Sequence, residues 1–229
     1  LIVGIFYIFF EASIQAETIT TTATATTYTT SESEQQFNEV ETHIIKTNLY
    51  LNTYWTGGFE FGSGIIIDQD ETYYYAITNE HVIDGDNHTI NGQSVTTYDE
   101  VQSSFEIIAS SETLDLALLR FEKGDHDSTI TPLQLSTTFE QNNLVLSIGN
   151  PYANIGTITY GFIEEITILN ELEIAHQVIQ HSCPLYRGSS GGALVNEDGL
   201  LIGINTWELN GEYYAIQSSV IQTYILNNL

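Results

Sequence analysis

A serine set among three glycines is the strongest chemical signal in this sequence. The segment Gly188-Ser189-Ser190-Gly191-Gly192 precedes the apolar run Ala193-Leu194-Val195. A serine hydroxyl attacks a carbonyl well only when a base removes its proton and nearby groups stabilise the oxyanion. Glycines allow a sharp turn that brings neighbouring backbone N–H groups together. The segment therefore indicates the nucleophile of a hydrolase, although an ordinary glycine-rich turn would have the same pattern.

The order of the histidines along the chain decides between two kinds of hydrolase. The segment also fits the G-x-S-x-G pattern of α/β-hydrolases, in which the histidine follows the serine. All six histidines of this chain precede Ser190, namely His43, His81, His88, His126, His176 and His181. The α/β-hydrolase interpretation therefore lacks its base, whereas the order His, Asp, Ser remains open.

Two upstream segments have the residues that a base and an orienting acid require. His81 follows the β-rich runs 64–67 and 73–75, which predict a hairpin that delivers this histidine at its end. Asp115 precedes the apolar run 116–121, which predicts an acid at the entrance of a strand. Such an acid can hold the imidazole tautomer whose second nitrogen accepts the serine proton. Each segment is weak by itself, but together they occur in the required order.

These motifs together resemble a trypsin-like (chymotrypsin-fold) serine protease, most closely the protease domain of bacterial HtrA/Deg-type enzymes. The matching segments lie between about residues 40 and 225: Phe61–Ile67, Thr78–Ile83, Asp115–Leu119, Gly188–Leu194, Leu201–Thr206 and Tyr214–Ile216. The resemblance implies that His81 is the general base, Asp115 orients it and Ser190 is the nucleophile. It also implies an oxyanion hole made by the backbone N–H groups of Gly188 and Ser190. Ser189 stands where the family usually has Asn.

The expected fold is all-β, with short strands separated by polar turns. β-branched and aromatic residues are abundant, and 42% of the residues are hydrophobic. The resemblance implies two six-stranded antiparallel β-barrels with the active site between them. We expect the first barrel at about 37–124 and the second at about 130–229. A short C-terminal helix is predicted over 218–226, with a serine cap.

The specificity pocket is expected beside the nucleophile. The resemblance places 182–187 on one wall and the strand 204–207 on another, where substrate backbone would pair as an added strand. The residues expected to bind substrate are Cys183, Pro184, Asn205, Thr206 and Trp207. A trypsin-type pocket needs a buried carboxylate at its base, and no acid lies between Ser182 and Ser190. We therefore expect small or medium apolar side chains in the pocket rather than Lys or Arg, with Arg187 and Glu208 as modifiers.

Other interpretations of the polar residues near Ser190 are weaker. His176, His181 and Cys183 lie close together in sequence, but they match no standard zinc spacing and have no evident fourth ligand. Cys183 is the only cysteine, and it lacks the glycine-rich setting of a nucleophile, so a small buried residue is expected there. We predict no metal and no cofactor.

The N-terminal residues resemble a targeting segment. Leu1–Phe10 is almost wholly apolar, and 11–16 has the composition of a cleavage region. We expect residues 1–16 to be a truncated signal peptide, with a membrane anchor as the second choice, and the protein to be secreted. Residues 17–36 are rich in Thr and Ser and are predicted to be a linker, so that the protease domain spans 37–229.

Composition restricts the partners of this chain. The formal net charge is −26, because only four residues are Lys or Arg. Nucleic-acid binding and strong binding to anionic membranes are disfavoured, since both need cationic side chains. A single cysteine excludes an intramolecular disulfide. HtrA-type proteins usually have a PDZ domain after the protease domain; we expect none here, and therefore expect a monomer that acts on protein or peptide substrates. Two alternatives remain: an inactive binding or adhesion protein with this fold, and an esterase with the same residues.

Overall fold

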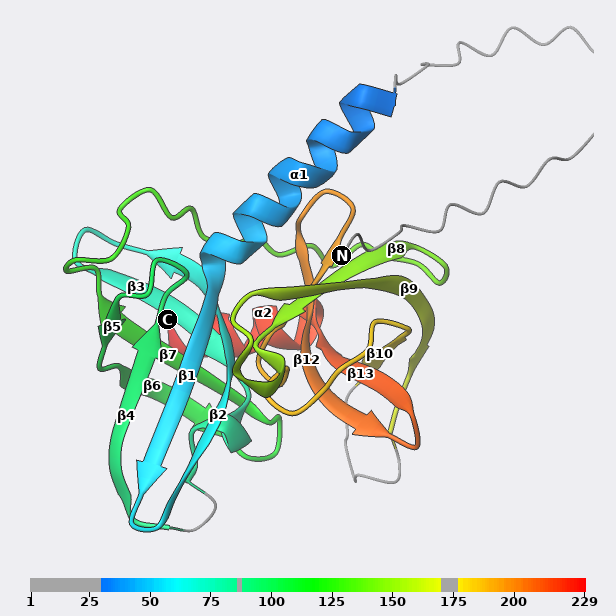
Figure 1. Cartoon of the computed structure of the whole chain (residues 1–229). Coiled ribbons are helices and arrows are strands. Elements are labelled where there is room, and N and C mark those ends of the chain that lie inside the picture. Colours follow the sequence, from blue (N-terminus) through cyan, green and yellow to red (C-terminus); the bar gives the residue numbers. More distant parts are fainter. Residues whose placement is uncertain (1–29, 86–87, 170–176) are drawn as a thin grey trace, which may run out of the picture.

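The computed structural model describes residues 30–85, 88–169 and 177–229, with side chains of the first helix described from Phe37 onward. Two antiparallel β-units lie side by side, and helix α2 (Ser218–Asn228) lies at their junction (Figure 1). Helix α1 (Thr30–Thr47) leads into the first unit and projects away from the body at its N-terminal end (Figure 1). The predicted all-β architecture is confirmed.

The first unit is a seven-stranded sheet with the strand order β5-β4-β1-β2-β3-β7-β6. Its strands are β1 (Asn48–Trp55), β2 (Gly58–Gln69), β3 (Tyr73–Thr78), β4 (Ile90–Thr96), β5 (Gln102–Ser103), β6 (Glu106–Ser111) and β7 (Leu116–Glu122). The expectation of a closed six-stranded barrel was wrong here. Among the described residues, β5 pairs only with β4 and β6 only with β7, because no ladder joins these two edges.

The second unit is the expected closed six-stranded barrel, with the order β10-β13-β12-β11-β8-β9. Its strands are β8 (Leu144–Gly149), β9 (Thr157–Thr167), β10 (Val178–His181), β11 (Ala193–Asn196), β12 (Leu201–Leu209) and β13 (Glu212–Gln217). Two short 3₁₀ helices matter for the site: η1 (Glu80–Val82) follows β3, and η2 (Pro151–Ala153) follows β8.

One hydrophobic core joins the two units. It takes side chains from the first sheet, from the barrel and from both helices, including Ile44, Ile65, Ile77, Leu118, Ile148, Ala193, Ile204 and Ile221. Burying an aliphatic side chain of this size contributes about 1.5–3 kcal/mol, so the shared core fixes one unit against the other. Residues far apart in sequence can therefore meet at the junction with little freedom.

Helix α1 begins within the segment that was predicted to be a linker. The linker was expected to extend to Gln36, but the helix begins at Thr30. Phe37, Val40 and Ile44 follow the i, i+3, i+7 spacing of one helical face and pack on the shared core. The predicted signal segment 1–16 and the linker up to residue 29 lie outside the described residues.

Helix α2 confirms the predicted C-terminal helix but not its serine cap. The N-cap position is Gln217, which makes no side-chain capping bond. Ser218 is buried in the first turn, and its hydroxyl donates instead to the carbonyl of Ser136 at 2.5 Å. Neither α1 nor α2, the two α-helices of the described chain, combines the length and the apolar composition needed to cross a membrane.

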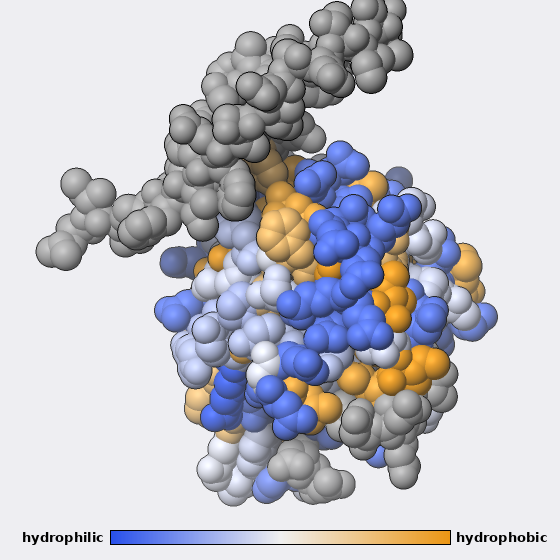
Figure 2. All heavy atoms as spheres, turned by 90° about the vertical axis from the view of Figure 1, so that its right-hand side faces the viewer, coloured by the Kyte–Doolittle hydropathy of each residue, from blue (hydrophilic) through white to orange (hydrophobic). Residues whose placement is uncertain are grey.

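The outer face of the second barrel carries apolar side chains as well as polar ones. Tyr160 and Phe162 project from β9 with exposed fractions of 50% and 53%. Figure 2 views the molecule from the barrel side and shows apolar patches between larger polar areas. Isolated exposed aromatic residues of this kind are common on soluble proteins and do not by themselves indicate a site.

Candidate active site

The imidazole of His81 is held by the carboxylate of Asp115. Nδ1 of His81 lies 2.9 Å and 3.0 Å from the two carboxylate oxygens, and the His81 backbone N–H donates to Oδ1 at 3.1 Å. As predicted, β3 ends just before His81, and Asp115 immediately precedes β7. Asp115 has φ of 51°, a left-handed conformation that Asp adopts more readily than most residues. The turn aims its carboxylate back at His81.

The surroundings of His81 favour its protonated form. Desolvation lowers the pKa of His81, but the hydrogen bond and charge of Asp115, with Asp84 and Glu80, outweigh it and raise the pKa above 6.5. With Nδ1 occupied by Asp115, the proton acceptor on the ring is Nε2. The side chain is 44% exposed, so a substrate can reach it.

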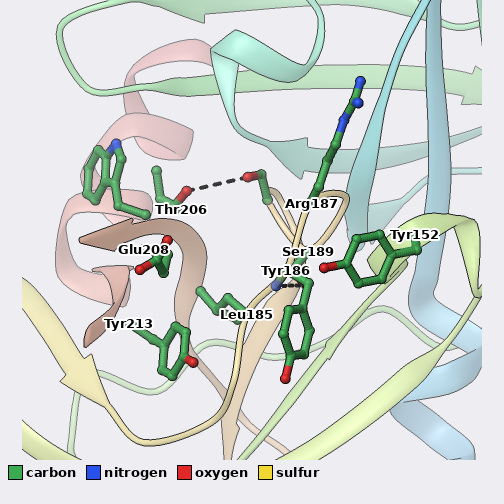
Figure 3. A pocket seen from close by; sticks show the side chains of 10 residues that line it. Tyr152, Leu185, Tyr186, Arg187, Ser189, Thr206, Glu208 and Tyr213 are labelled. Atoms are coloured by element: carbon green, nitrogen blue, oxygen red, sulfur yellow. Dashed lines mark hydrogen bonds between the residues drawn. The ribbon is translucent and has the colours of Figure 1, made fainter. Parts of the chain in front are cut away.

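Asn79 and Thr206 connect this pair to the glycine-rich turn. The Asn79 amide donates to the Asp115 carbonyl and to the Thr206 hydroxyl, both at 2.9 Å. The Ser190 hydroxyl donates to the Thr206 carbonyl at 3.4 Å (Figure 3). No hydrogen bond joins Ser190 to His81 within the described part of the chain. Asn79 therefore positions Asp115 and the strand that carries Thr206 relative to each other.

The backbone of the turn packs directly on strand β2. The Ser63 N–H donates to the Ser190 carbonyl at 2.8 Å. A Cβ on Gly62 would lie within 2.7 Å of Val82 and 3.1 Å of the Ser190 carbonyl. Gly62 therefore packs closely between the segment of His81 and the segment of Ser190, with no room for a side chain. Gly191 has φ of +82°, and a Cβ there would come within 2.0 Å of the Ser63 carbonyl. Glycine is required at this contact because any side chain would push the two units apart.

The two serines of the turn have different surroundings. Ser189 is buried, and its hydroxyl accepts a hydrogen bond from the Tyr186 N–H at 3.1 Å, while its own N–H donates to the Tyr186 carbonyl at 2.8 Å. Both serines line a pocket, but only Ser190 is partly exposed. Ser189 therefore stabilises the loop, and Ser190 is the hydroxyl that a ligand can reach.

The peptide plane before Gly188 is fixed by the η2 turn. The Tyr152 N–H donates to the Arg187 carbonyl at 2.8 Å, and because the peptide is trans, the Gly188 N–H points the opposite way. Tyr152 and Ala153 have φ of 52° and 63°, which costs on the order of 1–3 kcal/mol for each such residue. Within the described residues, the N–H groups of Gly188 and Ser190 donate to no other group. The strained residues Tyr152 and Ala153 therefore lie in the turn that orients the unpaired Gly188 N–H.

A buried polar network fixes the peptide plane after Gly188. The Gly188 carbonyl accepts hydrogen bonds from the Ser63 hydroxyl at 2.7 Å and from the Asn150 N–H at 3.4 Å. The Asn150 amide donates to the Leu49 carbonyl at 2.8 Å, and its oxygen accepts from Asn48 at 2.7 Å. The three polar side chains of this network, Asn48, Ser63 and Asn150, come from segments remote from Gly188 in sequence, and burial makes each bond costly to break.

A pocket with a volume of ≈ 360 Å³ opens beside Ser190. Aromatic side chains dominate its walls, and one carboxylate is present (Figure 3). The lining residues are Tyr152, Leu185, Tyr186, Arg187, Ser189, Ser190, Thr206, Trp207, Glu208 and Tyr213. The Glu208 carboxylate lies on the exposed end of β12 and accepts the Gly211 N–H at 2.8 Å.

Three residues expected in this pocket lie elsewhere. Cys183 and Asn205 have no exposed surface: Cys183 packs in the barrel core, and Asn205 donates to Ser147 and to the Ala193 carbonyl. Pro184 is partly exposed but does not line the pocket. Cys183 and Asn205 cannot line the pocket, because their side chains face the barrel interior. Thr206 and Trp207 do line the pocket, and Leu185, Tyr186, Glu208 and Tyr213 complete it.

The histidines and cysteine near Ser190 form no metal site within the described residues. His176 lies outside those residues. Cys183 is buried, and burial raises the pKa of its thiol to about 12, which leaves little thiolate at neutral pH. His181 has no exposed surface, stacks on Tyr213, and neither ring nitrogen has a partner among the described residues. Burial lowers the pKa of His181 to about 3.

His181 is expected to make the folded state sensitive to acid. Between pH 6.5 and about 3 the unfolded histidine binds a proton that the folded one does not, so stability falls as pH falls. The loss is about 1.4 kcal/mol per pH unit in this window. Replacing His181 with Leu should flatten the dependence, as measured by urea unfolding at pH 7 and pH 5. A variant that loses as much stability as the wild type would contradict this assignment.

Sequence reasoning missed the residues that hold the turn. Ser63 and Asn79 belong to segments quoted for the resemblance, but nothing in their neighbourhood marks them as partners of Gly188 or Thr206. Asn150 precedes Pro151 and would be taken for a turn residue. Their contacts join positions 87 to 127 residues apart, which a local pattern does not encode.

The curated proteins that this chain resembles are named serine proteases. The chain is 37% identical over 147 residues to a probable periplasmic serine endoprotease DegP-like of Buchnera aphidicola, which covers 63% of this chain and 29% of that protein. It is 30% identical over 173 residues to the serine protease Do-like HtrB of Bacillus subtilis, covering 69% of this chain and 37% of that one. The chain thus spans about a third of the length of these curated relatives.

Solved structures support the fold. The HtrA-type protease AlgW with tripeptide superimposes with a TM-score of 0.72 at 24% identity, over 83% of this chain and 62% of that one. The pattern of the trypsin-like peptidase domain matches residues 62–204, which include His81, Asp115 and Ser190 and form more than half of the chain. The chain belongs to the trypsin-like peptidase family.

Proposed function

We propose that this protein is a serine endopeptidase in which His81, Asp115 and Ser190 form the catalytic triad. The observation that carries the proposal is the double contact of His81 Nδ1 with Asp115, at 2.9 Å and 3.0 Å, beside the accessible Ser190. Nε2 of His81 takes the Ser190 proton as the hydroxyl attacks a peptide carbonyl. The same nitrogen then protonates the leaving amine, and water hydrolyses the acyl-enzyme.

The proposal requires Ser190 to change rotamer. Its hydroxyl donates to the Thr206 carbonyl at a long 3.4 Å, which is a weak bond. Rotation about χ1 would direct Oγ toward His81 at small cost, since staggered wells interconvert readily at a partly exposed serine. Hydrogen bonds of catalytic groups often tighten only when substrate is bound.

The N–H groups of Gly188 and Ser190 are proposed as the oxyanion hole. Neither has a competing acceptor among the described residues, and the η2 turn and the network of Ser63 and Asn150 hold the peptide planes on both sides of Gly188. Donors fixed in advance stabilise the oxyanion without reorganisation.

The pocket is proposed to prefer neutral, apolar side chains over Lys and Arg at the residue before the scissile bond. Leu185, Tyr213 and Trp207 give it apolar walls. Glu208 is its only carboxylate within the described structure, and this side chain is exposed and already accepts the Gly211 N–H. A hydrated carboxylate at the rim attracts a cation far less than a buried one at the base.

The compartment and partners are also proposals. Relatives are named periplasmic serine endoproteases, and the apolar N-terminal residues support secretion of this chain. Protein or peptide substrates fit the exposed triad, and a monomer is the simplest form. Three of the four cationic side chains, Lys46, Arg120 and Arg187, pair with carboxylates, which argues against a nucleic-acid surface.

Labelling with a fluorophosphonate probe tests the assignment. Wild-type protein and Ser189→Ala should become labelled at Ser190, whereas Ser190→Ala should not. The Ser189→Ala variant is the matched control, since it removes the neighbouring hydroxyl. Labelling that persists in Ser190→Ala would contradict the proposal. Comparison of peptide and ester cleavage then separates an endopeptidase from an esterase, and absence of both would favour a binding protein.

A further inference from the structure

Aromatic side chains line one face of the β1–β2 hairpin. Asn52 is paired with Phe61 and Tyr54 with Phe59, and Tyr50 lies one step diagonally from Phe61. These residues alternate along each strand and therefore project from the same face of the sheet. Ring centroids are 6.2 Å apart for Tyr54 and Phe59, 6.2 Å for Phe59 and Phe61, and 5.9 Å for Tyr50 and Phe61. We call Tyr50, Tyr54, Phe59 and Phe61 the aromatic strip.

The strip forms one wall of a groove rather than a buried core. Phe59 is 52% exposed and Tyr54 is 39% exposed. The groove has a volume of ≈ 500 Å³ and is lined by Tyr50, Asn52, Tyr54, Phe59, Thr96, Glu100, Gln102 and Ile155. Contact of these aromatic rings with water is unfavourable, so covering them with a ligand would be favourable. Contiguous exposed apolar surfaces of this kind mark interaction sites.

The strip is continuous with the candidate active site. The Arg187 guanidinium lies over the Phe61 ring at 5.4 Å and contacts Glu60 at 3.2 Å, and Arg187 also lines the pocket beside Ser190. Two residues after Phe61, the Ser63 N–H donates to the Ser190 carbonyl. A polypeptide that crosses Ser190 can thus continue onto Phe61 without leaving the surface.

The position of the strip identifies which part of a substrate reaches it. Arg187 and Tyr152 lie on one side of the pocket, and Thr206 and Glu208 lie on the other (Figure 3). In the proposed function, the acyl half of the substrate pairs with the strand of Thr206. The amine half must then leave toward Arg187 and Phe61.

We propose that the aromatic strip binds apolar or aromatic side chains of the polypeptide substrate, a few residues C-terminal to the scissile bond. This inference rests on the proposed endopeptidase function and adds a second recognition site to it. The polar side chains of Thr96 and Gln102 also line the groove, which suits the backbone of an extended peptide. The carboxylate of Glu100, which lines the groove, disfavours acidic segments and anionic membranes.

Two peptides with a common acyl half test the proposal. One has Phe and Leu at the third to sixth positions after the scissile bond, and the other has Ser and Gly there. Phe59→Ala should lower kcat/KM for the apolar peptide about fivefold to tenfold, the size expected for one aromatic contact. It should leave the Ser/Gly peptide and fluorophosphonate labelling unchanged. Phe162→Ala is the matched control, since Phe162 is 53% exposed on β9.

A direct measurement of peptide binding tests the aromatic strip without relying on catalysis. Fluorescence anisotropy with Ser190→Ala should show tighter binding of the apolar peptide than of the Ser/Gly peptide, and Phe59→Ala should abolish the difference. Equal losses for both peptides, or equal losses in Phe162→Ala, would overturn the inference. So would light scattering that shows a dimer dispersed by Phe59→Ala, because a second copy would then occupy the strip. A protein that binds the apolar peptide but cleaves nothing would refute only the proposed function.

Discussion

Replacing Asp115 with Asn is expected to lower kcat for peptide hydrolysis about 10⁴-fold. An amide can donate a hydrogen bond to His81 Nδ1 and so favours the tautomer whose Nε2 carries the proton. That nitrogen can no longer accept the Ser190 proton. The backbone should tolerate the change, because Asn adopts the left-handed conformation of residue 115 as readily as Asp. Steady-state kinetics on a cleaved peptide would measure the loss.

The pH dependence of Asp115→Asn shows whether its loss of activity comes from the altered His81 imidazole or from a defect in folding. In the wild type the raised pKa of His81 places the lower limb of kcat/KM above pH 6.5, because activity falls as His81 becomes protonated. Loss of the Asp115 charge should move that limb to lower pH. Asp198→Asn, on an exposed turn remote from His81, is the matched control and should change neither kcat nor the limb. An unchanged kcat in folded Asp115→Asn would refute the proposed triad.

Replacing Ser63 with Ala is expected to slow acylation of Ser190 about 10-fold to 100-fold, less than the loss of an oxyanion-hole donor. The Gly188 carbonyl would lose its 2.7 Å bond and keep only the 3.4 Å contact with the Asn150 N–H. The peptide planes around Gly188 would then sample other orientations. The second-order rate of fluorophosphonate labelling measures this effect below the unfolding temperature.

A matched variant isolates the role of Ser63 from a loss of stability. Thr47→Val removes another buried hydroxyl, which donates to the Ile44 carbonyl at 3.0 Å in helix α1. Both substitutions should lower the free energy of unfolding by about 1–3 kcal/mol. Only Ser63→Ala should slow labelling, and KM for a short substrate should change little. Equal labelling rates in both variants would show that the network supports the fold alone.

The candidate site residues could be predicted because each lies in a short segment with a recognisable sequence pattern. His81, Asp115 and Ser190 each lie at a strand end or turn that hydrophobic alternation and glycine mark in the sequence. Their order excluded the α/β-hydrolase interpretation, and the resemblance carried by their segments predicted two β-units, of which the second is a closed barrel. The segment 218–226 separately predicted the closing helix. The contact between His81 and Asp115 in the structure agrees with that order.

Other features depended on contacts that no local pattern records. Helix α1 packs through Phe37, Val40 and Ile44 on a core that both units build. The rest of its sequence is mostly polar, so the sequence alone suggested a linker rather than the start of a helix. The inward orientation of Asn205 depends on the register of β12, where a shift of one residue reverses the face of every side chain.

The sequence by itself determined which groups are proposed to perform hydrolysis and in what order they occur along the chain. Only the tertiary structure decided how Gly188 is held, which side chains line the pocket, and that an aromatic strip continues from it. The physical reason is distance along the chain. Hydrogen bonds such as that from Ser63 to Gly188 join residues 125 positions apart, and they exist only once the shared core has fixed the two units together.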